Sequence, residues 1–231
     1  MKKFLGYASN GKFSVGCTGQ TVYIYDKDNN EVCKHKDIAY GYTPMISPDG
    51  SLFVVKSTVG ILAVYSLETF SLIKKFRFSK VDGAQDDGCC FSSDGSLFFN
   101  IERQEDTLHT AVSIYDTSDF SLIKRIYQDE NMVLSHIEYD SRTNSYYVLG
   151  FLRNKDGVLF RCFVAKFEEY QIKELIDIPE KEYDFLVSYK NLEIMGFTEK
   201  AYQWSYLDCS LDELKNKNYT LADLHFNVSV I

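Results

Sequence analysis

The chain has 231 residues, of which 45% are hydrophobic and 15% aromatic, so it has ample material for a core and is not a disordered protein. Its formal net charge of -8 argues against sequence-independent binding to nucleic acid or to an anionic membrane, because both require clustered lysine and arginine. We therefore expect one folded domain that binds neither nucleic acid nor membranes.

The N-terminal segment and the cysteines bear on the cellular compartment. The apolar run near the N-terminus is too short for a signal peptide, and no later run reaches the length of about 18 residues that a membrane helix needs. The six cysteines form no CxxC pair and have no histidine at zinc-site spacing. We predict reduced, packed thiols, no metal or cofactor, and a cytoplasmic location.

The first predicted unit covers residues 1–38. Its strands lie in ASNGKFSVG and QTVYIYD, and a turn follows at DKDNNE, residues 26–31. This turn begins like a calcium-binding loop, but Glu31 occupies the position at which such a loop needs glycine. We interpret DKDNNE as a polar hairpin turn.

The next two units, residues 39–82 and 83–131, repeat one pattern at a spacing of about 45 residues. SPDGSLFVV returns as SSDGSLFFN, and SLETFSLIKKF is answered by TSDFSLIKRI. Each unit predicts four short strands, with an Asp-Gly turn between the first two. Gly50 and Gly95 are expected at positive φ, which glycine adopts without steric cost.

Two weaker copies complete the chain. Residues 132–182 contain HIEYDSRTNSYYVLG, in which the turn is widened to DSRTN, and then LFRCFVAKF and QIKELIDI. Residues 183–231 give a degenerate fifth copy, and 224–231 are expected to form its outer strand. Because the first unit begins with its own inner strand, we expect the first and fifth units to meet through side-chain packing, without a shared strand.

Four-stranded units of about 40 to 45 residues are typical of β-propeller blades. SPDGSLFVV followed by an apolar strand ending in Tyr-Asp, as at Tyr25-Asp26 and Tyr115-Asp116, resembles the WD40-like β-propeller superfamily, with Tyr in place of the usual Trp. The chain lacks the Gly-His and Trp-Asp dipeptides of typical WD40 blades and is closer to divergent bacterial propellers. The resemblance implies an all-β fold, a five-bladed β-propeller of four-stranded antiparallel blades, in one domain covering residues 1–231.

The fourth strands of the first four units carry basic residues, among them Lys74, Lys75, Lys124 and Arg125. In a propeller this strand is the outer edge of its blade, where charge discourages pairing with another chain. An acidic partner is the alternative explanation.

One acid/base pattern stands out, because His136, Glu138 and Asp140 alternate along a predicted strand and share one face. This spacing fits general acid/base catalysis or a structural polar cluster. The paired carboxylates of a glycosidase would come instead from separate blades near the axis. We expect the chain not to be an enzyme.

The loops that join successive units, and those that join second to third strands, share one face of the predicted disc, which we call the loop face. Aromatic and arginine side chains on such a face suit protein contacts. We therefore predict a non-catalytic protein-binding or scaffold module. The alternatives are a lectin-like carbohydrate binder, which would repeat its loop residues in every blade, and a glycoside hydrolase-like enzyme with axial carboxylates. The candidate binding residues are Tyr40, Tyr42, Asp87, Arg103, Glu105 and Arg153.

Overall fold

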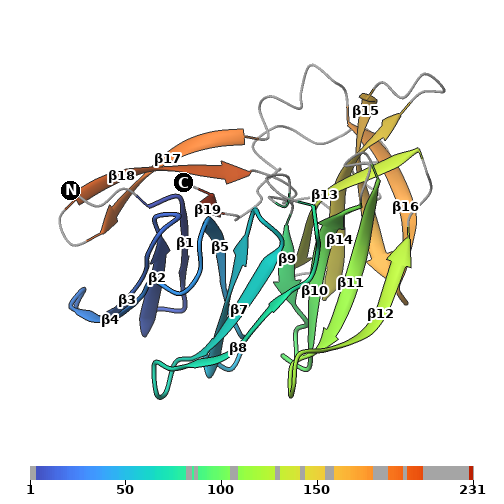
Figure 1. Ribbon diagram of the computed structural model, residues 1–231. Helices are drawn as coiled ribbons and strands as arrows, with labels where there is room; N and C mark the ends of the chain where they lie inside the picture. The colour runs from blue at the N-terminus through green and yellow to red at the C-terminus, as the bar shows by residue number, and fades with distance from the viewer. Residues whose placement is uncertain are drawn as a thin grey trace.

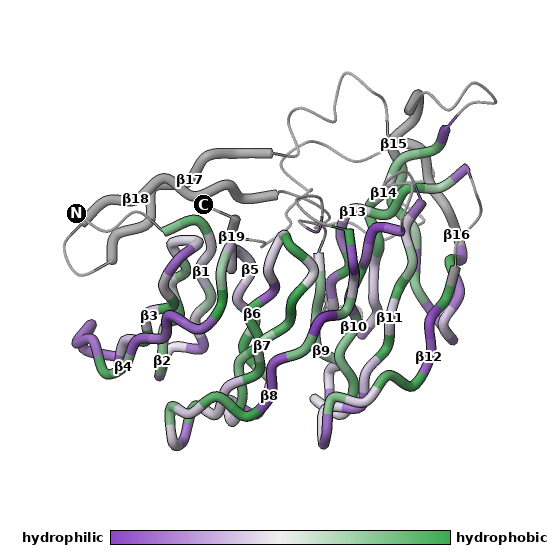
Figure 2. The backbone as a smooth tube through the Cα atoms, viewed as in Figure 1, coloured by the Kyte–Doolittle hydropathy of each residue, from purple (hydrophilic) through white to green (hydrophobic). Residues whose placement is uncertain are grey.

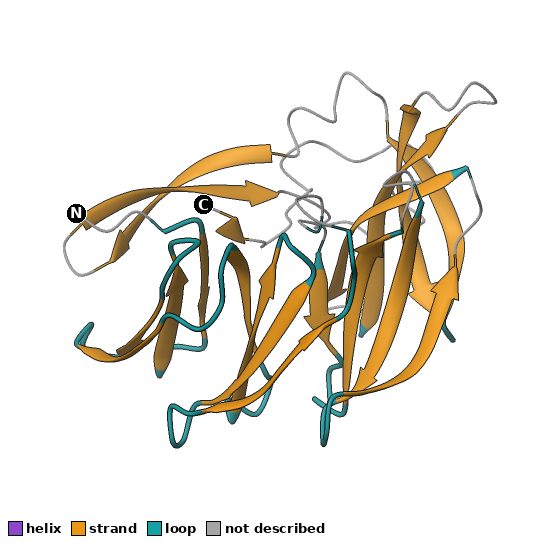
Figure 3. Cartoon of the chain, in the orientation of Figure 1, coloured by secondary structure: helices purple, strands orange, loops and turns teal. Residues whose placement is uncertain are grey.

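A computed structural model describes residues 4–81, 85, 88–104, 109–127, 131–140, 144–153, 159–178, 187–194, 197–204 and 229–230. The regular elements of these residues are antiparallel β-strands (Figure 3), so the predicted all-β class is confirmed. Within these ranges there is no helix with the length and apolar character needed to cross a membrane.

Three four-stranded sheets form the second, third and fourth blades, and they stand side by side in Figure 1. In each blade the strands follow chain order from the inner to the outer edge. The inner strands of successive blades lie next to one another, as expected around a common axis. The strands of the second blade are β5 (Gly41–Ile46), β6 (Leu52–Ser57), β7 (Ile61–Ser66) and β8 (Leu72–Arg77); those of the third are β9 (Cys89–Phe91), β10 (Leu97–Arg103), β11 (Thr110–Asp116) and β12 (Ser121–Tyr127); those of the fourth are β13 (Met132–Asp140), β14 (Ser145–Arg153), β15 (Leu159–Glu168) and β16 (Gln171–Ile178).

The first blade belongs to a seven-stranded sheet in the order β17-β18-β19-β1-β2-β3-β4. Gly6 pairs with Val230, and Val230 also pairs with Tyr202, so a strand near the C-terminus joins the first blade to the last hairpin. The strands of this sheet are β1 (Gly6–Ser9), β2 (Phe13–Cys17), β3 (Val22–Asp26), β4 (Glu31–His35), β17 (Val187–Ile194), β18 (Phe197–Trp204) and β19 (Ser229–Val230).

This sheet corrects two expectations. The described strands form four sheets, not five separate blades, and the first and last units share hydrogen-bonded strands where we expected only side-chain packing. The physical reason lies in β1, the inner edge of the first blade, whose outward N–H and C=O groups need a partner that β19 supplies. The chain is therefore all-β and propeller-like.

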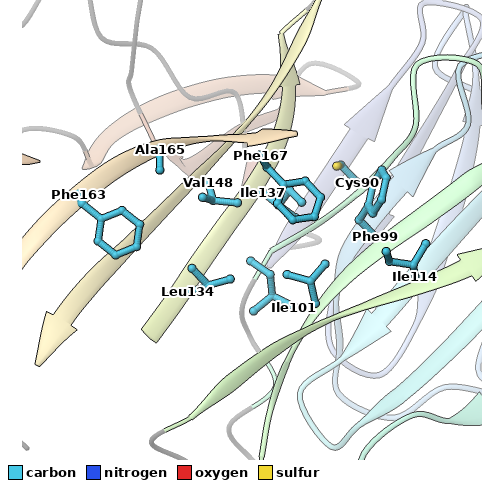
Figure 4. Packing of buried hydrophobic residues seen from close by; sticks show 11 residues of the cluster. Cys90, Phe99, Ile101, Ile114, Leu134, Ile137, Val148, Phe163, Ala165 and Phe167 are labelled. Carbon is cyan, nitrogen blue, oxygen red and sulfur yellow. The ribbon is translucent and has the colours of Figure 1, made fainter. Parts of the chain in front are cut away.

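The core lies between the blades, because the middle strands of each blade bury both faces. Figure 2 shows hydrophobic residues concentrated in strands such as β6, β7, β10 and β11, with hydrophilic segments along β4, β8 and β12. Figure 4 shows one core cluster, in which side chains of the third blade meet those of the fourth. Consecutive apolar residues are expected when a sheet packs on both sides. The labelled members include Cys90, Phe99, Ile101, Leu134, Val148 and Phe163.

The repeated Asp-Gly turns adopt the predicted backbone, since Gly50 has φ 72° and Gly95 has φ 76°. In the third blade the Asp94 carboxylate accepts hydrogen bonds from Ser92 Oγ at 2.6 Å and from Ser96 N at 3.0 Å. The hydroxyl of Ser92 also accepts a bond from the main chain of the next strand. The second blade has the same arrangement around its own aspartate. Each residue that the two S-x-D-G-S phrases share thus has a role in closing the turn.

DKDNNE forms the predicted polar hairpin turn between β3 and β4. The Asp26 carboxylate accepts hydrogen bonds from the main-chain N–H groups of Asp28 and Asn30, each at 2.9 Å. Hydrogen bonds from Asn30, with smaller contributions from Asp28 and Lys27, lower the pKa of Asp26. The turn therefore uses this carboxylate for its own backbone.

Basic residues of the outer strands make contacts within the chain. Lys75 Nζ donates to Asp37 O at 2.7 Å, between the first and second blades. Arg125 forms an ion pair with Glu102, a buried residue on the second strand of the same blade. At these positions the charge stabilises the assembly of strands in addition to any protection of the edge.

Candidate binding surfaces

Tyr40 is the predicted loop-face residue that the structure exposes most clearly. Its side chain is 56% exposed, and its backbone has φ 54°, which is uncommon for a bulky residue. Tyr40 O accepts a hydrogen bond from Thr58 N at 3.1 Å, and the preceding Ala39 O accepts one from Ser57 Oγ at 2.6 Å. The backbone beneath the ring is thus fixed by the β6–β7 turn while the ring lies in solvent.

Tyr42 has a different environment from Tyr40, although the two residues flank one glycine. It is half-buried at the start of β5, where its ring packs close to Gly19 of the first blade. A Cβ atom at Gly19 would lie 3.0 Å from Tyr42 Cε1, so the ring would have to shift slightly to make room for a side chain there. Tyr42 therefore contributes to the contact between the first two blades as well as to the loop face.

A buried glutamine connects Tyr40 to Arg103. Gln85 N donates to Thr58 O at 3.1 Å, and Thr58 in turn donates to Tyr40 O. The Gln85 side chain then bonds both main-chain groups of Arg103, accepting from its N at 2.9 Å and donating to its O at 3.0 Å. Hydrogen bonds thus link the loops of the second and third blades into one surface.

Gln85 was not among the candidate residues predicted from the sequence, although the structure buries its side chain. One feature of the sequence could have indicated its role, because Gln85 is an amide in a run otherwise made of acidic and small residues. An amide side chain can pair with a hydrogen-bond donor and an acceptor at once.

The remaining candidate binding residues are Arg153, Asp87 and Glu105. Arg153, at the end of β14, is only 8% exposed, so its guanidinium contributes little to the loop surface. Asp87 and Glu105 lie outside the described residues.

The predicted acid/base strand contains a buried histidine. His136 is buried, and burial followed by the nearby charge of Lys56 lowers its pKa to about 3. Ser135 Oγ lies 2.9 Å from His136 Nδ1. The imidazole is therefore neutral at physiological pH and shielded from solvent, which fits the structural alternative. The side chain of Asp140 lies outside the described residues.

Lys56 is a second buried polar residue that the apolar pattern of its strand concealed. Its Nζ donates to Ile101 O at 2.5 Å, from the second blade to the third, and lies 5.5 Å from the centroid of the Phe78 ring. Burial of Cys89 nearby raises the pKa of that thiol to about 11, an effect that the charge of Lys56 opposes. Lys56 thus ties two blades together in their interior.

A groove of about 460 Å³ lies between the third and fourth blades on the face that carries the Asp-Gly turns, at the bottom of Figure 1. We call this face the turn face, and it is opposite the loop face. Tyr146 Oη accepts a hydrogen bond from Ser93 N at 2.7 Å across the two blades. The groove is lined by the β9–β10 turn, the start of β14 and the β15–β16 turn; its aromatic members are Phe99, Tyr146, Phe167 and Tyr170.

Two of the carboxylates at this groove, Glu168 and Glu169, are paired within the fourth blade, whereas the third, Asp94, accepts hydrogen bonds from Ser92 and Ser96 of its own turn. Lys166 Nζ lies 3.2 Å from a Glu168 carboxylate oxygen, and Lys173 Nζ lies 2.7 Å from one of Glu169. The carboxylates of the β15–β16 turn thus have local countercharges. Of the predicted binding residues that the structure describes, none lines this groove.

Comparison with known proteins gives fold relatives only. No protein-family model matches the chain, and no curated protein sequence matches it. A hydrazine synthase from Kuenenia stuttgartiensis superposes with a TM-score of 0.62 at 14% identity, covering 95% of this chain and 72% of that one. The WD40 domain of Toxoplasma gondii coronin gives 0.56 at 16% identity, covering 75% of this chain and 45% of that one. A structure of U3-55K gives 0.57 at 10% identity, covering 76% and 52%.

At these identities the likeness shows the fold alone. A WD40 domain is among the matching structures, so the resemblance seen in the sequence is confirmed at the level of a β-propeller-like fold. The chain spans about half or less of the coronin and U3-55K chains.

Proposed function

We propose that the chain is a non-catalytic protein-binding module, a divergent WD40-like propeller whose partner contacts the loop face around Tyr40 and Arg103. The observation that carries the proposal is the presentation of Tyr40. A large aromatic side chain that is mostly exposed, on a backbone held by hydrogen bonds, is already ordered for binding. Such anchors lose little conformational entropy when a partner covers them.

The backbone of Tyr40 supports the same proposal. Positive φ at a bulky residue is energetically unfavourable and persists only where surrounding structure imposes it. Here the β6–β7 turn imposes it through Thr58 and Ser57. The chain therefore maintains a strained conformation that places an aromatic ring in solvent, where it contributes nothing to the core.

The predicted cytoplasmic location belongs to the same proposal. Cys17, Cys89 and Cys90 are free and buried, and burial raises the pKa of each thiol. Unreactive packed thiols fit a reducing compartment. Catalysis is the alternative class, and the match to a hydrazine synthase reflects the fold only.

The test is affinity capture of a partner from native lysate, followed by a binding titration with the purified partner. Tyr40→Ala should weaken binding by about tenfold or more. Tyr42→Ala combined with Arg103→Ala should also weaken it, and this double variant should lower the melting temperature as well, because the Tyr42 ring packs against the first blade.

Ile73→Ala is the matched control, because Ile73 is 55% exposed but lies on the outer strand β8. Binding that survives Tyr40→Ala and the double variant, yet fails in Ile73→Ala, would move the interface to the rim and overturn the loop-face assignment.

A further inference from the structure

The outer turns of the second and third blades each end in a phenylalanine that packs into an interface. Phe70 has φ 53° and Phe120 has φ 51°, so both leave the turn in the same left-handed conformation. The ring of Phe70 lies 5.5 Å from that of Phe13 in the first blade. Phe120, only 3% exposed, belongs to a core cluster shared by the second and third blades. Each ring thus fills the part of the space between neighbouring blades that lies beside its outer turn.

The fourth blade has a shorter outer turn. Glu168 pairs with Gln171, so only Glu169 and Tyr170 separate β15 from β16. In the third blade Asp116 pairs with Ser121, and the longer segment between them carries the buried phenylalanine. Tyr170 remains 41% exposed, and the groove of about 460 Å³ lies beside it. The groove is thus the space that a longer turn fills in the preceding blades.

A repeated lysine contacts this turn from the preceding blade. Lys74 Nζ donates to Asp119 O at 2.6 Å and to Phe120 O at 3.1 Å, from the second blade to the third. Lys124 occupies the same position of the SLIK phrase in the third blade. Its Nζ lies 5.7 Å from the centroid of the Tyr170 ring. The third blade therefore presents the lysine beside a turn that has been shortened.

We propose that this groove binds a peptide segment of another protein, with a phenylalanine side chain inserted between the third and fourth blades and an acidic residue just before it. The segment would take the place that Ser118, Asp119 and Phe120 occupy in the preceding interface. Lys124 would bond its main-chain carbonyl groups as Lys74 bonds those of the internal turn.

The chain itself supports this choice of occupant. Both internal turns place an acidic residue within two positions before the phenylalanine, as E-T-F and D-F. The aromatic lining of the groove matches a phenyl ring, and Lys124 adds a positive charge near its mouth. Glu168 and Glu169 are paired with lysines, and the Asp94 carboxylate accepts hydrogen bonds from Ser92 and Ser96, so all three oppose an acidic peptide less than free carboxylates would.

The site goes beyond the proposed loop-face function, because it lies on the opposite face and does not involve Tyr40. The direct probe is a fluorescent peptide that copies residues 116–122 of the chain, titrated with the full-length protein and followed by anisotropy. A second peptide has alanine in place of the phenylalanine. We expect the alanine peptide to bind at least about tenfold more weakly.

Two variants locate the binding. Ser93→Trp should abolish peptide binding, because the indole ring fills the groove. Lys124→Ala should weaken peptide binding about fivefold without a change in packing. If Ser93→Trp fails to fold, Lys124→Ala still decides the question. Lys34→Ala, at an exposed lysine of the first blade's outer strand, should change nothing. Tyr40→Ala should also leave peptide binding unchanged, which separates this proposal from the loop-face one. Equal binding of both peptides, or binding of an oligosaccharide probe in place of either peptide, would overturn the proposal.

Discussion

The interface between the second and third blades and the interface between the third and fourth blades are built from the same repeat but are packed differently. At the interface between the second and third blades, Phe120 is buried beside Phe98, and Lys74 of the second blade donates a hydrogen bond to the turn that carries Phe120. At the interface between the third and fourth blades, Tyr170 is exposed at the edge of a groove. The difference shows that the length of one outer turn decides whether the space beside that turn is filled by a phenylalanine or left as a groove.

The largest expected effect contrasts these two aromatic residues. Phe120→Ala should lower the free energy of unfolding by about 3 to 5 kcal/mol, because it removes a buried phenyl ring. Tyr170→Ala should lower it by only about 0.5 kcal/mol, as is usual for a surface change. Urea denaturation of both variants measures the contrast. Equal losses would show that the two interfaces are packed alike.

A smaller effect is expected at the repeated turns. Gly50→Val and Gly95→Val should each cost about 1 kcal/mol or more, because valine is strained at positive φ. Gly50 should be the more sensitive site, since its added Cβ would lie 2.9 Å from Asn10 Nδ2, whereas that of Gly95 would lie 3.6 Å from Pro48 Cδ.

The turn of the fourth blade supplies the control for these glycines. It already has a non-glycine residue, Asn144, at φ 51°. Asn144→Gly should relieve the strain at positive φ but also remove the hydrogen bond that Asn144 Oδ1 accepts from Tyr139 Oη at 2.8 Å, so the denaturation midpoint should change little. A large loss there would mean that the fourth blade does not follow the backbone rule of the second and third.

The smallest expected effect depends on pH. Hydrogen bonds from Ser92 and Ser96 lower the pKa of Asp94 from 3.8 to about 2 in the folded protein. A lowered folded-state pKa gives a stabilising contribution that is present above the unfolded value of 3.8 and is lost as pH falls toward 2. Asp94→Asn should therefore reduce the melting temperature modestly at pH 7. The gap between variant and native protein should narrow between pH 4 and pH 2, and a constant gap would contradict this origin.

Much of the fold follows from local sequence. Local patterns predicted the strands of the second and third blades and the positive φ of Gly50 and Gly95. These patterns are the Asp-Gly phrases, the apolar runs on either side of them and the spacing of the units. These features depend on residues close together in the chain, which a repeated pattern makes visible. The exposed Tyr40 was likewise identifiable, because an aromatic residue beside glycine stands out in a connecting loop.

The remaining features depend on distant residues. No residue near Gln85 in the sequence indicates that its amide bridges the loops of two blades. The sequence around Lys56 predicts only a polar residue at the end of an apolar strand. The groove arises from a shorter turn in the fourth blade, which becomes visible only when its Tyr170 is aligned with Phe120. The pairing of Gly6 with Val230 joins opposite ends of the sequence, and no local pattern specifies it.

That pairing orders the events of folding during synthesis. The strands of the second, third and fourth blades neighbour one another in sequence, so they can form as soon as they leave the ribosome. The inner strand of the first blade must wait until residues 229–230 have been made before its second edge is hydrogen-bonded. Until then β1 presents an open edge to other nascent chains, which makes chain termination upstream of these residues a route to aggregation.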